Sequence, residues 1–443
     1  MTASTTTLTG ALRAAPYAGY TYGYPHKTTY RPLDPPTTLR DAWAGERTDQ
    51  LFGYLHLPFC EMRCGFCNLF TTANPHDDLV DAYLRALRRE AAAVTGHLGR
   101  VRAARLAVGG GTPTYLTAAQ LDDALTLLAL TCRVTPGQVP LSVETSPATA
   151  TPDRLAVLEQ AGTTRISIGV QSFDLAEVHR VGRPHRPGHT EQALDAIRRH
   201  STAALNIDLI YGLEGQDVTS WTASLRQALH WEPEEVFCYP LYVRPLTGIG
   251  RHPRAWDDQR LTLYRTARDL LTGAGYRQTS MRRFVRDTPQ RPDGWSEPEY
   301  SCQDDGMLGL GCGARSYTRG LHWSREYAVG RSGVRAILDA YTRTDDFTVV
   351  GHGIRLPVAE QQRRFVLQSV LSTGLVHDSF RARFGSQVLD VLPQLRGLLD
   401  EELATDDGDV LALTAAGLEL SDAIGPWLYS QQVRALTADH RLR

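Results

Sequence analysis

The stretch that decides the fold is residues 54–70, YLHLPFCEMRCGFCNLF, which holds three of the seven cysteines of the chain. Cys60, Cys64 and Cys67 have the spacing C-x3-C-x2-C, and no second C-x2-C pair occurs in the sequence. Structural zinc sites take four ligands, usually from two such pairs, and an odd number of cysteines in a cytosolic chain does not suggest a disulfide scaffold. His56 could complete a zinc site, but it lies in a strand-like segment before Cys60. A [4Fe–4S] cluster usually takes four thiolates, so we interpret the missing fourth ligand as an iron left open to a substrate or cofactor.

Composition narrows the class of protein further. The chain has 443 residues, 42% of them hydrophobic, and a net charge of −2, so nothing in its overall charge favours nucleic acid or a lipid surface. No apolar run reaches the length of a membrane span, and the N-terminus lacks the pattern of a signal peptide, so we expect a cytoplasmic protein. Lys27 is the single lysine, which excludes a P-loop and makes Schiff-base chemistry improbable.

Apolar strand patterns alternate with amphipathic helix patterns from residue 51 to residue 276. Such alternation predicts parallel βαβ units, and six strands fit a partial (β/α)6 barrel better than a short open sheet. In parallel barrels the active site lies at the carboxyl ends of the strands. The six predicted strands are residues 51–57, 105–111, 141–147, 165–172, 204–213 and 235–243.

The rhythm changes on either side of this core. Residues 1–50 are rich in Thr, Pro and Tyr and are predicted as an extension, residues 51–290 as the barrel, and residues 291–443 as a C-terminal domain that covers the substrate. Beyond residue 355 helices and a short hairpin suggest an α+β, winged-helix-like unit. Its mixed charges show no basic stripe, so we do not expect it to bind nucleic acid. The segment 309–314, GLGCGA, fits a loose dinucleotide pattern, but no strand is expected before it.

Six motifs in order carry a family resemblance: YLHLPFC (54–60), GGGTPTYL (109–116), VETSP (143–147), RISIGVQSF (165–173), NIDLIYGL (206–213) and GLGCGARS (309–316). With the cysteine spacing, they resemble the radical S-adenosylmethionine (SAM) superfamily, and within it the anaerobic coproporphyrinogen III oxidase-like branch, which includes class C methyltransferases. The match covers roughly residues 50–430. It implies a radical SAM barrel, a [4Fe–4S] cluster on Cys60, Cys64 and Cys67, and two SAM molecules. An external electron donor such as flavodoxin or ferredoxin is also expected.

Several polar residues at the ends of the predicted strands are candidate binding residues. A carboxylate such as Glu144 can bind ribose hydroxyls, and Asp208 and Gln171 stand in apolar strands where an unpaired polar group is costly. The resemblance implies that Tyr54, Gly110 and Glu144 serve the SAM on the cluster. It implies that the second SAM is held by Phe66, Gly111, Thr112, Gln171, Arg183, Asp208 and Pro240. Arg315 stands where the oxidase contacts the first SAM through its backbone. The oxidase carries an apolar side chain at this position, so the arginine of this chain puts that contact in doubt.

Three functions fit these motifs. We rank first a class C radical SAM methyltransferase or methylene transferase, in which the second SAM supplies carbon to an sp2 carbon of a specialised metabolite by C-methylation or cyclopropanation. The alternatives are an oxygen-independent coproporphyrinogen III oxidase, which oxidatively decarboxylates two propionates, and a heme-binding chaperone of the same branch. The oxidase has a further cysteine where this chain has Leu69, and chaperone-like relatives often read PYCDF where this chain reads GFCNLF, so these residues decide the ranking. In the two enzyme readings the substrate is a small molecule.

Overall fold

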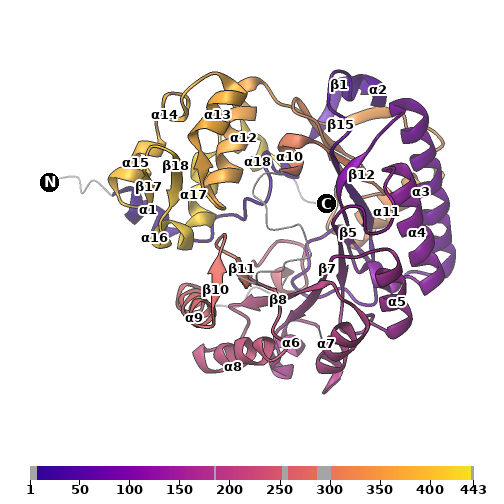
Figure 1. Ribbon diagram of the computed structural model, residues 1–443, viewed down its shortest axis with the longest axis horizontal. Coiled ribbons are helices and arrows are strands. Elements are labelled where there is room, and N and C mark those ends of the chain that lie inside the picture. The colour runs from indigo at the N-terminus through magenta and orange to yellow at the C-terminus, as the bar shows by residue number, and fades with distance from the viewer. Residues whose placement is uncertain (1–6, 184–185, 252–257, 287–300, 441–443) are drawn as a thin grey trace.

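A computed structural model describes residues 7–183, 186–251, 258–286 and 301–440 of the chain (Figure 1). Within them a large sheet has the strand order β1-β15-β14-β13-β12-β2-β5-β6-β7-β8-β9-β11-β10. The six predicted strands are adjacent in this order, and each is parallel to its neighbour. The predicted α/β fold with a mostly parallel sheet is therefore confirmed. These six strands are β2 (Leu51–Leu57), β5 (Ala103–Gly110), β6 (Leu141–Thr145), β7 (Arg165–Gln171), β8 (Ala204–Tyr211) and β9 (Glu235–Pro240).

Helices follow these strands and cover the outer face of the curved sheet (Figure 1). They are α3 (Asp77–Leu98), α4 (Ala118–Thr131), α5 (Pro152–Gln160), α6 (Leu175–Arg180), α7 (His189–His200), α8 (Val218–Leu229) and α9 (Arg260–Gly273). Capping boxes mark the first residues of α4 and α8. Thr117 with Gln120 and Asp217 with Ser220 form these boxes, which satisfy free backbone N–H groups.

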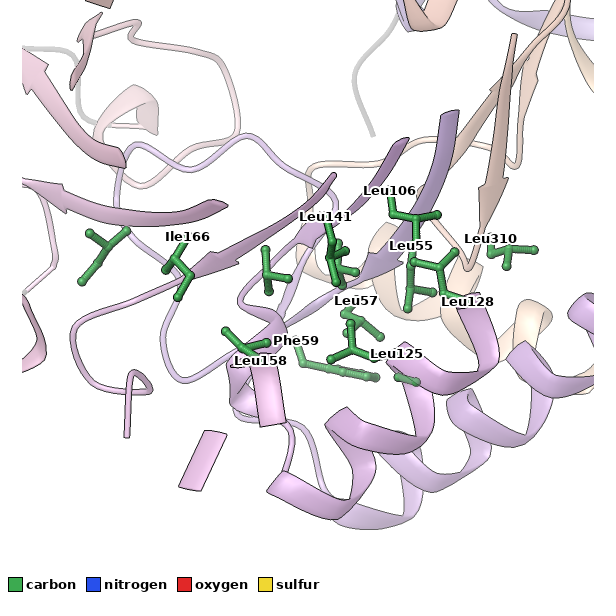
Figure 2. Close-up of a cluster of buried hydrophobic side chains, with 14 of the residues drawn as sticks. Leu55, Leu57, Phe59, Leu106, Leu125, Leu128, Leu141, Leu158, Ile166 and Leu310 are labelled. Atoms are coloured by element: carbon green, nitrogen blue, oxygen red, sulfur yellow. The ribbon is translucent and has the colours of Figure 1, made fainter. Parts of the chain in front are cut away.

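The main core lies between this outer face and the helices (Figure 2). Leu55 and Leu57 of β2 are buried there with Leu125 and Leu128 of α4. Side chains alternate between the faces of a strand, so the residues between these leucines point to the inner face of the sheet. The strand sequences therefore decide which side chains are available on the inner face.

One sequence expectation about the sheet is wrong. A strand, β12 (Met307–Leu310), does precede the GLGCGA segment, and it pairs parallel with β2. It escaped prediction because four residues after an acidic turn are too short to show a period. Instead of a helix, an antiparallel series of strands follows it, which extends the sheet on this side: β13 (Arg315–Tyr317), β14 (Leu321–Ser324) and β15 (Val349–Arg355), with β1 (Arg31–Thr38) at the edge.

The opposite side of the sheet ends in an antiparallel hairpin. Its strands are β10 (Tyr276–Gln278) and β11 (Arg283–Arg286), and β11 pairs with β9. Because β1 and β10 are the two ends of the sheet order, the barrel is open. The short strands β3 (Phe59–Cys60) and β4 (Thr72–Ala73) lie between β2 and α3 in the chain. The helix α10 (Cys302–Asp305) precedes β12, and α11 (Arg331–Arg343) joins β14 to β15.

The C-terminal residues form a unit with a second hydrophobic core. It combines helices with the antiparallel sheet β16-β18-β17, which agrees with the α+β prediction, while its winged-helix character stays a prediction. The expected boundary at residue 290 lies outside the described residues. The elements are α12 (Val358–Val370), β16 (Leu375–Val376), α13 (His377–Phe384), α14 (Val388–Val391), α15 (Leu395–Asp400), β17 (Ala404–Asp406), β18 (Val410–Leu413), α16 (Ala415–Glu419), α17 (Ser421–Leu428) and α18 (Gln431–Ala438).

The N-terminal segment, described from residue 7, joins both parts of the molecule. Its helices are α1 (Leu8–Ala14) and α2 (Leu39–Ala42), and Figure 1 shows α1 beside the C-terminal unit. Glu401 accepts a hydrogen bond from the backbone N–H of Leu8 at 2.6 Å, and Arg31 donates to the carbonyl of Leu436 at 2.7 Å. Tyr24 is buried in the C-terminal core. Among the described residues, no helix is long and apolar enough to cross a membrane.

Candidate active site

The three cysteines lie on a loop that follows β2 and is tied to several neighbours. Gly65 donates its N–H to the carbonyl of Val181 at 2.8 Å and accepts from the N–H of Ile249 at 2.9 Å. The carbonyl of Cys60 accepts from Asn74 at 2.7 Å. These backbone bonds hold the loop at the carboxyl ends of the parallel strands, where the sequence placed it.

The thiols are free and close enough to influence one another. Burial raises the pKa of Cys60 to about 12, and the neighbouring Cys67 and Cys64 thiols act in the same direction. Burial and Cys64 likewise raise the pKa of Cys67. Thr112 lies beside this group, with its hydroxyl 3.8 Å from the sulfur of Cys60.

The glycine run 109–111, at the end of β5, lies in close contact with this loop. A Cβ atom on Gly111 would come within 2.5 Å of the carbonyl oxygen of Phe59 and 2.9 Å of the Cys60 sulfur. Gly110 has φ +118° and lies against the ring of His56. Only glycine fits both positions, so GGG has a steric reason that does not depend on any ligand.

His56 is a neutral side chain that orients its neighbour. Burial lowers its pKa to about 4, so it is uncharged at neutral pH. Its Nε2 lies 3.0 Å from the carbonyl oxygen of Phe70 and therefore donates, which leaves Nδ1 to accept from the Tyr54 hydroxyl at 3.2 Å. His56 thus fixes Tyr54 on the inner face and is not placed as a fourth cluster ligand. Sequence alternation with Tyr54 could have revealed this role.

Glu144 stands on the inner face of β6 and keeps accessible surface, so water or a ligand can reach it. Its carboxylate accepts the N–H of Gly110 at 3.0 Å, which joins two predicted residues of the first SAM site. Burial raises its pKa to about 7, an effect that Gly110 opposes and Asp208 reinforces. A carboxylate held this way can accept hydrogen bonds from hydroxyl groups.

Asp208 has the polar partners that its position in an apolar strand requires. Ser167 donates to one carboxylate oxygen at 3.1 Å, and the amide of Asn206 donates to the other at 2.8 Å. Burial raises the pKa of Asp208, although Arg165 opposes the shift. Arg165 is in turn paired with the buried Glu235 at 2.9 Å. This polar network on the inner face was not foreseen in the sequence.

Gln171 and Arg183 lie together beside the cysteine loop. A bulge at the end of β7 gives Gln171 a φ of +74°, which is uncommon for a residue with a side chain and re-aims it. Arg183 donates to the carbonyl of Gly169 at 2.6 Å and lies 3.1 Å from the sulfur of Cys64. The structure therefore brings Arg183 to the cluster loop as well as to the strand ends.

The remaining predicted residues lie at separate points of the same edge. Phe66 packs on a small apolar cluster that includes Ile210 and Leu241, and Pro240 ends β9 opposite Tyr211. Arg315 begins β13, with its guanidinium carbon 5.0 Å from the ring of Tyr22. Arg315 thus faces the N-terminal segment, which the resemblance did not imply.

The donor set fits an iron–sulfur cluster better than a single ion. In the described part of the chain, no group of three or more His, Cys, Asp or Glu side chains is placed to hold one metal ion. Three thiolates of a [4Fe–4S] cluster bind three different irons and so need not converge on one point. Three free thiols on one short loop, with no carboxylate or imidazole completing a single-ion site, meet that requirement.

Known proteins share this arrangement. The Radical SAM superfamily model matches residues 54–228. The heme chaperone HemW of Escherichia coli (strain K12) is 29% identical over 274 residues, which are 59% of this chain and 68% of that protein. The oxygen-independent coproporphyrinogen III oxidase of Bradyrhizobium diazoefficiens is 28% identical over 378 residues, or 81% of this chain and 82% of that protein. The structure of coproporphyrinogen III oxidase (HemN) from Escherichia coli matches with a TM-score of 0.74 at 23% identity, and covers 88% of this chain and 92% of that one. At that identity the match shows the fold alone.

The cysteine loop, the parallel sheet and these matches define the class of the domain: the chain carries a Radical SAM domain over residues 54–228. Its relatives include oxygen-independent coproporphyrinogen III oxidases and heme chaperone HemW, the group that the motifs predicted. A [4Fe–4S] cluster and SAM are the cofactors of this class, which confirms that expectation. Proteins of the class act on small molecules and take electrons from an external donor.

The first-ranked function is wrong. The relatives are named as coproporphyrinogen III oxidases and heme chaperones, which contradicts a class C methyltransferase or methylene transferase of natural product biosynthesis. The motifs that suggested it are those predicted to hold the cluster and SAM, so they do not report the substrate. The ranking then depended on residues 65–70, GFCNLF, where the exposed side chain of Leu69 does not by itself decide between functions.

Proposed function

We propose that this chain is a radical SAM oxidase of the oxygen-independent coproporphyrinogen III oxidase type, which removes carboxyl groups from propionate side chains of its substrate. One observation supports it over a chaperone. The matches to the oxidases of Bradyrhizobium diazoefficiens and Pseudomonas aeruginosa extend over 81% and 87% of the chain, whereas two other oxidases match over 53% and the HemW proteins over 59% to 61%. Two oxidases are therefore similar to this chain over more of its length than HemW is.

The residues divide the work as follows. Cys60, Cys64 and Cys67 would hold the cluster, and Tyr54 with Glu144 would hold the SAM on its open iron. Gln171, Arg183 and Asp208 would hold a second SAM, as the resemblance implies, along with Phe66, Gly111, Thr112 and Pro240. When bound, the cluster and SAM supply a carbon radical that removes a hydrogen atom from the substrate. The hydrogen bonds of Glu144 and Asp208 keep both carboxylates fixed before the cofactors bind, so little order is lost on binding.

We also propose that residues 291–443 cover the substrate. Asp422 of the C-terminal unit forms an ion pair with Arg282 and accepts a hydrogen bond from Tyr242, and both groups follow the last barrel strand. These contacts hold the unit over the carboxyl ends of the strands. Flavodoxin or ferredoxin as electron donor, and a cytoplasmic location, stay predictions.

The test is anaerobic turnover. Reconstituted protein is incubated with SAM, dithionite, an electron acceptor and coproporphyrinogen III, and the products are analysed by mass spectrometry. The oxidase should release carbon dioxide, leave vinyl groups in place of propionates and form 5′-deoxyadenosine, and Cys64→Ala should abolish all three. Release of 5′-deoxyadenosine without any change in the mass of the tetrapyrrole would refute the proposal.

The heme chaperone is the second candidate, because heme chaperone HemW of Escherichia coli and that of Bacillus subtilis are among the relatives of this chain. It predicts that the protein binds heme and leaves coproporphyrinogen III unchanged. Titration with heme, followed by its absorbance, therefore separates the two functions in the same preparation.

A further inference from the structure

Two cations that the mechanism does not use lie beside the cysteine loop. The only lysine of the chain, Lys27, comes from the N-terminal segment, and its ammonium group lies 3.5 Å from the centre of the Tyr327 ring. The Tyr327 hydroxyl donates to the carbonyl of Asn68, the residue after Cys67. Lys27 is thus one aromatic ring away from the proposed cluster ligands.

Arg315 is the second cation, and it reaches the same place from β13. Its guanidinium carbon is 5.0 Å from the ring of Tyr22 and 5.8 Å from the ring of Tyr317. The Tyr22 hydroxyl bonds His26, the residue before Lys27, at 3.0 Å. The charge of Arg315 acts on Lys27, and together with burial it lowers the pKa of that lysine well below its usual value.

No carboxylate among the described residues pairs with these two cations, although the Cys67 thiol favours the charged form of Lys27. Neither the ammonium of Lys27 nor the guanidinium of Arg315 has a hydrogen bond or ion pair to a carboxylate in the described part of the chain; both contact aromatic rings instead. His26 is neutral, because burial lowers its pKa well below the usual value and Lys27 and Arg315 reinforce that shift. Burial and the neighbouring charge of Arg315 outweigh the Cys67 thiol, so an anion that reaches this pair would stabilise the charged form of the lysine.

We propose that Lys27 and Arg315 bind a carboxylate of the substrate and hold it beside the cluster. This inference rests on the proposed function, because it assigns the recognition of the substrate's propionate to two named side chains. The rings of Tyr22 and Tyr327 would lie against the apolar part of the ligand next to that carboxylate. Tyr22 is 39% exposed, so a ligand can reach it.

Binding measurements on the reconstituted holoprotein test this assignment. Coproporphyrinogen III is equilibrated with the protein anaerobically, and the free ligand is separated, oxidised and measured by its fluorescence. Lys27→Met and Arg315→Met should each raise the Kd on the order of tenfold to a hundredfold, as expected for the loss of one charge-assisted hydrogen bond. Lys27→Arg should stay within about threefold of the wild type, since it keeps the charge. Arg85→Met, which removes one charge from an exposed position on α3, should leave the Kd unchanged.

The same variants separate substrate binding from a role in holding the cofactors. Lys27→Met should keep the iron content and the SAM affinity of the wild type. Loss of iron or weaker SAM binding in Lys27→Met would show that the cation serves the cofactors, and an unchanged Kd for coproporphyrinogen III in both Met variants would show that neither binds the substrate. Either result overturns the inference while leaving the proposed function intact.

A second measurement applies if the wild type does not bind coproporphyrinogen III, which would refute the proposed function instead. Protein grown with 13C-labelled lysine carries a single labelled side chain, because Lys27 is the only lysine. Its NMR signal should move when propionate is added, should not move with propionamide, and should no longer respond in Arg315→Met. A signal that ignores propionate, or that responds equally to the amide, overturns the proposed carboxylate site.

Discussion

Replacement of Glu144 by glutamine should weaken SAM binding in a way that depends on pH. The carboxylate accepts the N–H of Gly110 at 3.0 Å and has a pKa raised to about 7 by burial. Raising the pH therefore converts it from a neutral acid to the anion that accepts hydrogen bonds strongly. With that pKa, the ionised fraction rises from about one tenth at pH 6 to about nine tenths at pH 8.

The size of the effect follows from these values. A hydrogen bond to a charged group contributes about 1.5–3 kcal/mol, or roughly a tenfold to hundredfold change in Kd. Glu144→Gln should therefore raise the Kd for SAM roughly tenfold to a hundredfold at pH 8. At pH 6 the increase should be about ten times smaller, that is, between about no change and roughly tenfold. The ratio of the two proteins is the quantity to compare, because titration of SAM itself cancels in it.

Anaerobic equilibrium dialysis with labelled SAM at pH 6, 7 and 8 measures both proteins. Asp122→Asn, which removes an exposed carboxylate on α4, is the control and should match the wild type at each pH. Equal Kd values for wild type and Glu144→Gln at pH 8, or a ratio that does not change with pH, would refute the assignment of Glu144 to the SAM site.

Three further changes probe the rest of the site. Cys64→Ala should lose the cluster, which in the wild type should give about four irons and four sulfides per chain; retention of stoichiometric zinc without sulfide in anaerobic protein would contradict this. Asp208→Ala should keep 5′-deoxyadenosine formation within about threefold but lower product formation more than about tenfold, and an equal loss of both would place Asp208 with the first SAM. Burial alone would raise the pKa of Glu235, but Arg165 and Arg283 lower it to about 2, so its stabilising effect is complete above pH 4.5 and is lost as the pH falls toward 2. In urea unfolding at pH 7, Glu235→Gln should cost about 3–5 kcal/mol, whereas Asp123→Asn, which breaks the exposed ion pair with Arg88, should cost less than about 1 kcal/mol; equal costs would contradict this reasoning.

The sequence predicted the parallel strands well because each is an apolar run followed by a helix with a clear start. It also singled out Glu144 and Asp208, since a polar residue in an apolar strand is conspicuous, although Asp208 lies inside β8 rather than at its end. It missed β12, which is too short for a period, and the Ser167–Asn206–Asp208 network, which depends on the register between β7 and β8. Strand register is a property of the folded sheet and cannot be read from one strand.

The position of Lys27 could not be predicted for a different reason. Residues 1–50 show little periodicity, and their partners lie hundreds of positions away, as the contact between Arg31 and Leu436 illustrates. Such contacts leave no local pattern. The substrate is hidden in the same way, because the side chains proposed to recognise it come from the N-terminal segment and β13 rather than from the motifs that bind SAM.

The N-terminal segment that joins both parts of the molecule also sets an order of assembly. It leaves the ribosome hundreds of residues before Glu401 and Leu436, which hold it in place. The cysteine loop finds its partners Val181 and Ile249 much earlier. During synthesis there is thus an interval in which the three thiols are gathered but Lys27 and its neighbours do not yet cover them. The order of synthesis therefore allows the thiols to gather before the N-terminal segment is fixed against the C-terminal unit.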